Sequence, residues 1–264
     1  MEVSLLEKQF QQIGARLKLK PRNSGFNIDI LSDDKGEYFS LELDDNSQLD
    51  AKVIDVKAQE RHLLLMFCEG DRHSITKHKF LCGHDERHWF VAAVPGQSAK
   101  DVASAMEALK PPIVRYHQFR QGLKKSQRNR RKNKAYLRQG EWFFIPVEGF
   151  NPPANLILKN EPISRGRGSK PHICEFIYRS GGETVYVNYE FPNGITEAEY
   201  NKLCNQNPKY RKHNWKIMVR EPKVYAKGKV SHLDHATIVL NGWHQVEMNL
   251  EFKAPSMRNI SFLD

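Results

Sequence analysis

The stretch Arg120-Gln-Gly-Leu-Lys-Lys-Ser-Gln-Arg-Asn-Arg-Arg-Lys-Asn-Lys134 divides this chain into two parts. It belongs to a basic segment, residues 110–140, that contains eleven Lys or Arg and no Asp or Glu. The whole chain has 41 basic and 31 acidic residues, so the remainder is nearly neutral, with 30 against 31. A block of like charges repels itself and is disfavoured in a core. We therefore expect a solvated linker or arm that joins two folded lobes.

Both flanks of the basic segment show the pattern of antiparallel strands. Short apolar runs such as Tyr38–Leu43 and His88–Val94 are separated by turn residues. Capping-box spacings, for example at Thr196 and Glu199, mark a few short helices. The predicted fold class is α+β, with two mainly antiparallel β-rich lobes joined by a basic arm. The expected domains are residues 1–109, 110–140 and 141–264.

The pair Asn241-Gly242 is the strongest hairpin signal in the chain. It predicts a two-residue turn between a strand at 236–240 and another at 243–252. His244 alternates with apolar residues in the second of these strands. We therefore expect His244 to be a buried, hydrogen-bonded core residue.

Cysteine usage and the first residues bear on the compartment. The four cysteines, Cys68, Cys82, Cys174 and Cys204, have no paired spacing, which fits neither a disulfide framework nor a zinc ribbon. The chain does not start with a cationic and apolar leader, and its longest plain apolar run is too short to span a bilayer. We expect a reduced, cytoplasmic protein that does not bind membranes, and we make no prediction of its oligomeric state.

The basic segment favours a polyanionic partner, and nucleic acid is the first expectation. Lys and Arg neutralise phosphates and release counterions, which gives affinity without sequence preference. Aromatic residues interleaved with the charges suit unpaired bases, so RNA or single strands are favoured over duplex DNA. The candidate contacts in this segment are Arg120, Lys124, Lys125, Arg128, Arg130, Arg131, Lys132, Lys134 and Arg138.

A second basic surface is predicted on one strand. Lys223, Tyr225, Lys227 and Lys229 alternate with small or apolar residues, which places them on one face. We call these four residues the lysine face and expect it to support a nucleic-acid strand. An ordinary solvated sheet face is the competing interpretation. The glycine-rich loop from Arg165 to Lys170 is a third, weaker basic feature.

Two histidine–carboxylate clusters could hold a divalent metal. His84 and His88 flank a charged turn between two strands, and His232, Asp234 and His235 form a second group. The second spacing is similar to part of the His-x-His-x-Asp-His motif of the metallo-β-lactamase superfamily. That match covers four positions, and Val230 stands where the first histidine belongs. A further alternative brings both turns together around one ion.

Three functions follow from these features. The first is a nucleic-acid-binding protein without a resident cofactor. The second is a metal-dependent nuclease or phosphoesterase, with His232, Asp234 and His235 as its metal-binding and catalytic candidates. The third is an assembly factor whose basic segment binds an acidic protein.

Overall fold

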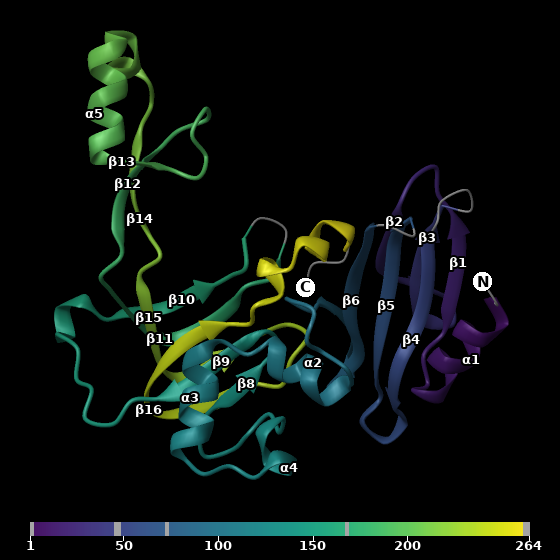
Figure 1. Ribbon diagram of the computed structural model, residues 1–264. Coiled ribbons are helices and arrows are strands. Elements are labelled where there is room, and N and C mark those ends of the chain that lie inside the picture. The colour runs from purple at the N-terminus through teal and green to yellow at the C-terminus, as the bar shows by residue number, and fades with distance from the viewer. Residues whose placement is uncertain (1–2, 45–48, 72–73, 167–168, 261–264) are drawn as a thin grey trace.

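The computed structural model describes residues 3–44, 49–71, 74–166 and 169–260, and it confirms a β-rich α+β fold (Figure 1). Within the described residues, all pairs of neighbouring strands are antiparallel except β1 with β3. The boundaries predicted for the three domains stay a prediction.

The first lobe has two sheets with a core between them. Helix α1 (Val3–Gln12) precedes the sheet β1-β3-β2, formed by Leu17–Pro21, Gly36–Leu43 and Phe26–Asp33. The second sheet contains β4 (Leu49–Lys57), β5 (His62–Asp71), β6 (Ser74–Asp85) and β7 (His88–Ala93) in that order. Fully buried aromatic rings from both sheets form the core, and α2 (Val102–Ala108) packs on the outer face of the second sheet.

The second lobe is built on a six-stranded sheet that curls around its own core. Its order is β10-β11-β15-β16-β9-β8. Gln139 of the edge strand β8 donates to the carbonyl oxygen of Val230 in β15, and a Cβ atom at Gly140 would lie 3.3 Å from His172 of β11, so the β8 edge approaches strands across the sheet. The strands are β8 (Leu137–Gln139), β9 (Trp142–Pro146), β10 (Leu158–Ile163), β11 (His172–Ser180), β15 (Lys223–Ser231) and β16 (Ile238–Met248).

The basic segment is folded rather than extended, which differs from the expectation of a solvated arm. It forms α3 (Pro112–Arg120), α4 (Lys125–Arg128) and strand β8. Four of its apolar side chains are buried together against Phe143 and Ile145 of β9. The sequence did not indicate this packing, because charged residues far outnumber the four apolar residues that anchor the segment. These four are Val114, Leu123, Ala135 and Tyr136.

The hairpin predicted at Asn241-Gly242 is wrong. Strand β16 runs through this pair without a turn. Ala226 of β15 faces His244, and Gly228 faces Leu240, so one residue of β15 opposes three of β16. The positive φ of Gly242, 91°, therefore serves a bulge within a strand. His244 is buried as expected, and its Nδ1 bonds to the carbonyl oxygen of Gly242 at 3.0 Å.

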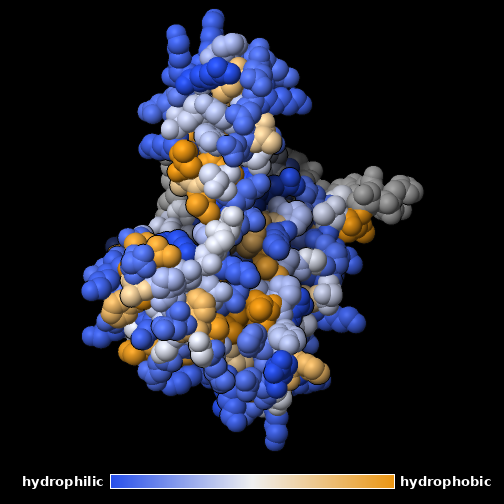
Figure 2. Space-filling model, turned by 90° about the vertical axis from the view of Figure 1, so that its left-hand side faces the viewer, coloured by the Kyte–Doolittle hydropathy of each residue, from blue (hydrophilic) through white to orange (hydrophobic). Residues whose placement is uncertain are grey.

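A β-ribbon projects from the second lobe (Figures 1 and 2). It consists of β12 (Glu183–Val187), β13 (Ile195–Thr196) and β14 (Lys216–Arg220), with α5 (Glu197–Gln206) beside them. The capping box predicted for α5 at Thr196 and Glu199 is present. Exposed apolar side chains lie along β14, namely Ile217, Met218 and Val219.

The C-terminal residues return to the first lobe. The amide of Leu250 donates to the carbonyl oxygen of Leu109, and Ile260 pairs with Ile28 in parallel. Ala254 and Ile260 are buried in the first core. None of the helices in the described part of the chain has the length and apolar character needed to cross a membrane. The short 3-10 helices are Ala58–Glu60, Ala154–Leu156, Pro208–Lys212, Glu251–Lys253 and Pro255–Asn259.

Candidate metal centre and nucleic-acid interface

The two histidine-containing turns meet where the lobes join. The first turn connects β6 with β7, and the second, residues 232–237, connects β15 with β16. The amide of Ala236 donates to Glu86 Oε2 at 2.7 Å, and His88 Nε2 lies 4.0 Å from Asp234 Oδ1. The turns therefore contact each other directly, although they are 150 residues apart in sequence.

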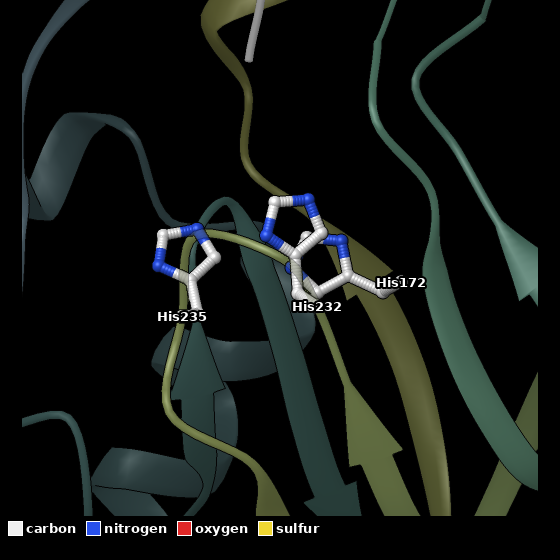
Figure 3. Close-up of side chains that lie close together, drawn as sticks. All are labelled: His172, His232 and His235. Carbon is white, nitrogen blue, oxygen red and sulfur yellow. The ribbon is translucent and has the colours of Figure 1, made fainter.

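Three histidines gather at this junction, and they form the histidine cluster: His172, His232 and His235. One ring nitrogen of each lies within 4.8 Å of the others. The rings of His172 and His232 stack with centroids 4.1 Å apart, and His235 lies 4.8 Å from His232 (Figure 3). The sequence prediction contained His232 and His235 but missed His172, the first residue of β11.

Strand pairing explains why His172 joins the cluster. Ile173 of β11 faces Ser231 of β15, so the residue before Ile173 lies beside the residue after Ser231. The second turn is then fixed by the side chain of Gln139, whose Nε2 donates to the carbonyl oxygens of Val230 and Ala236.

Burial keeps two of the three imidazoles neutral. Burial, with the charges of the neighbouring histidines, lowers the pKa of His172 to about 3, and burial lowers the pKa of His235 to about 4. A neutral imidazole has a lone pair free to bind a metal ion. No described residue forms a hydrogen bond with either ring nitrogen of His172 or His235.

The other metal candidates do not join the cluster. His84 packs edge-on against Trp89, with centroids 4.9 Å apart. His88 Nδ1 bonds to Glu37 Oε1 at 2.6 Å. Asp234 Oδ2 accepts from Lys170 Nζ at 2.6 Å, which directs this carboxylate toward the basic loop.

Part of the basic segment is used to join the lobes. Arg131 forms ion pairs with Asp85 and Glu86 of the first turn, and Arg138 lies 3.3 Å from Asp85. Lys110 is 3% exposed, and its ammonium donates to Glu107, to Asn129 and to the carbonyl oxygen of Arg128.

Cations of the Arg165–Lys170 loop also form ion pairs within the protein. Arg165 pairs with Glu251 and Lys170 with Asp234, while Arg167 lies outside the described residues.

The remaining charges of the segment face solvent. Six predicted contacts are exposed and make no ion pair with any described residue: Arg120, Lys124, Lys125, Arg130, Lys132 and Lys134. Arg128 is half-buried, and its Nε donates to the carbonyl oxygen of Leu123. Tyr116 and Phe119 beside these charges are 52% and 76% exposed. The segment therefore offers both cations and aromatic rings to a partner.

The lysine face lies on the same side of the sheet as the basic segment. Tyr225 faces Gln245 of β16, which in turn faces Ile145 of β9. Directly opposed residues of an antiparallel sheet share a face. Ile145 is covered by the basic segment. The side chains of Lys223, Lys227 and Lys229 are exposed, as the alternation predicts.

An aromatic group beside the lysine face was not predicted. Phe150 stacks on Tyr225 with centroids 4.3 Å apart, and it also contacts Tyr178 and Trp243. One side of the Tyr225 ring is therefore covered. An open groove of about 470 Å³ runs beside this group, lined by Phe150, Lys227 and Trp243 among others. A sequence signal existed in Gly149-Phe150, an aromatic residue in a loop, but its partners are far away in the chain.

Comparison with protein-family models, curated proteins and solved structures finds no match for this chain.

Proposed function

We propose that this protein binds nucleic acid, with single strands preferred, across one side of the six-stranded sheet. One observation supports this most strongly: the basic segment, which carries the unpaired cations, packs on the side of the sheet that bears the lysine face. Strands β15 and β9 are separated only by β16, a spacing of roughly 10 Å. A single nucleic-acid strand can therefore contact both surfaces.

The preference for unpaired bases follows from the aromatic groove. Phe150 has one side against Tyr225, and it borders an open groove that contains Lys227. A base in this groove stacks on an aromatic ring while the lysine contacts its phosphate, a combination that suits single strands. A duplex keeps its bases stacked inside, so it can use only the cations.

The test is a salt titration of binding to labelled single-stranded RNA, single-stranded DNA and duplex DNA, read by fluorescence anisotropy. With about six phosphate contacts, log affinity should fall against log salt with a slope near −4 on single strands and near −5 on duplex. A variant that neutralises four unpaired cations should flatten the single-strand slope by about 3. The variant is Lys124→Gln, Arg130→Gln, Lys132→Gln and Lys134→Gln.

The matched control removes the same charge elsewhere. Lys8, Lys20, Lys35 and Lys52 are exposed residues of the first lobe, and their replacement by Gln should leave the slope unchanged. An equal loss in both variants would mean that net charge, rather than this surface, drives binding. Polyglutamate serves as the acidic-protein probe. No binding to any nucleic acid at low salt, with tight binding to polyglutamate, would replace this proposal by the acidic-partner alternative.

A further inference from the structure

We propose that His172, His232 and His235 form a binding site for a divalent transition metal, zinc above all. The site joins the start of β11 to the turn between β15 and β16. This proposal is independent of nucleic-acid binding, because none of the three histidines belongs to either basic surface.

The first argument is the donor set. Three imidazoles without a thiolate suit zinc, copper, nickel or iron, whereas magnesium and calcium prefer oxygen ligands. Three histidines with a fourth position left for water are an established zinc arrangement. The cluster lies beside a cavity of about 70 Å³, lined by His235, Asp234 and Gly140 among others, which can hold water.

The second argument is the space that Gly140 leaves open. A Cβ atom at this position would lie 2.8 Å from His235 Nε2 and 3.3 Å from His172 Nε2. The Nε2 atoms of both buried rings therefore border the same small volume, and only a residue without a side chain leaves it free. The positive φ of Gly140, 56°, also favours glycine here.

The third argument is hydrogen bonding. His172 and His235 are 1% and 6% exposed, yet neither of their ring nitrogens has a hydrogen-bond partner among the described residues. Leaving buried polar atoms unpaired is unfavourable, so most such atoms in folded proteins have partners. A metal ion would satisfy one nitrogen of each ring. It would leave His235 Nδ1, which lies 3.8 Å from Glu86 Oε2, facing a carboxylate of the kind that commonly orients metal-bound histidines.

The geometry requires one ligand to turn. Nitrogens around a tetrahedral zinc ion stand roughly 3.4 Å apart, given Zn–N bonds of about 2.1 Å. The ring nitrogens of the cluster lie up to 4.8 Å apart, which is about 1.4 Å too long for a tetrahedral zinc ion. His232 is the ring able to move, since it is only half-buried. Its Nδ1 accepts from the amide of Asp234, and its Nε2 faces the carbonyl oxygen of Lys170, both of which lie near the surface.

The experiment measures zinc binding by the full chain after metal removal, by calorimetry and by elemental analysis following dialysis. We expect one zinc ion per chain, no competition from a large excess of magnesium, and a rise in melting temperature on adding zinc. His232→Gln should weaken zinc binding by at least 10-fold to 100-fold, the loss that removing even an outer-shell partner causes. Because His232 is half-exposed, this variant should still fold, and circular dichroism without metal checks that it does.

His213→Gln is the matched control, since His213 is half-buried but lies between the 3-10 helix Pro208–Lys212 and β14, outside the cluster. It should bind zinc as the wild-type chain does. Substitution of cobalt gives a second readout, because visible absorption reports nitrogen ligands in a tetrahedral site. Absence of a stoichiometric ion, or an equal loss of affinity in both variants, would overturn the proposal. Salt-dependent nucleic-acid binding should be the same with and without zinc, so failure of one proposal leaves the other standing.

Discussion

The basic segment and the lysine face carry the same kind of charge, but the protein uses the two regions differently. In the strand, alternation separates lysines from core residues, so Lys223, Lys227 and Lys229 all point to solvent. In the segment, Arg131 and Arg138 pair with the Asp85–Glu86 turn, and Lys110 is buried. A cation therefore becomes structural where the fold brings an acidic partner within reach, and it stays available to a ligand where no such partner exists.

The largest expected effect comes from removing the anchor of the basic segment. Tyr136 is 1% exposed, it packs on Phe143, and its hydroxyl donates to the carbonyl oxygen of Arg128. Tyr136→Ala should lower the free energy of unfolding by about 3–5 kcal/mol, as for other buried aromatic residues. Urea denaturation measures this loss, and trypsin should then cut the segment faster.

Phe119→Ala is the control for that variant. Phe119 is an aromatic residue of the same segment that is 76% exposed, so its removal should change stability by less than about 0.5 kcal/mol. Equal losses from both substitutions would mean that the segment is not anchored through Tyr136, and the contrast with the lysine face would then disappear.

The second-largest expected effect is on the pH dependence of the free energy of unfolding, through a histidine near the basic segment. Burial, together with the charges of Arg138 and Arg131, lowers the pKa of His62 to about 4. The ring fills the space beside Gly83, where an added Cβ would lie 2.5 Å from His62 Cδ2. His62 is thus neutral in the folded chain, whereas in the unfolded chain it takes up a proton below about pH 6.5.

The unfolded state therefore binds more protons between pH 6.5 and 4, and stability falls as the pH falls through that window. At 1.36 kcal/mol per pKa unit, His62 should account for a loss of about 2 kcal/mol between pH 7 and pH 5. Urea denaturation at both pH values, with a chelator present, measures the loss. His62→Gln should show a pH-dependent loss smaller by this amount. Identical pH dependence in the two proteins would show that the pKa of His62 is the same in the folded and unfolded chains, and hence that burial does not keep this ring neutral.

The sequence predicted local structure well and long-range structure poorly. Alternation located most strands, and the capping box at Thr196 located α5, because these signals depend on near neighbours. His172 was missed because only the pairing of β11 with β15 brings it to His232, 60 residues later. Asn241-Gly242 was misread for the same reason, since a glycine with positive φ suits a bulge as well as a turn, and only the partner strand decides between them.

The smallest expected effect compares one cation from each region. Lys124 and Lys227 are both exposed and unpaired within the described residues, so each should contribute one phosphate contact. Lys124→Gln and Lys227→Gln should each flatten the salt dependence on single strands by about 0.7, and the double variant by about 1.4. Stability should change by less than about 0.5 kcal/mol in every case. Anisotropy titrations at four salt concentrations, with Lys35→Gln as control, resolve such differences.

Whether the two changes in slope add in the double variant shows which surfaces contact the bound strand. Equal and additive changes in slope mean that one bound strand contacts both regions, as their shared side of the sheet predicts. If only Lys124→Gln changes the slope, the lysine face is an ordinary solvated surface and binding is confined to the basic segment. A change with Lys227→Gln alone would mean that the segment, for all its charge, serves mainly to join the two lobes. In that case the aromatic groove beside Phe150 would be the centre of the binding site, and Phe150→Ala should weaken binding to single strands while leaving binding to duplex unchanged.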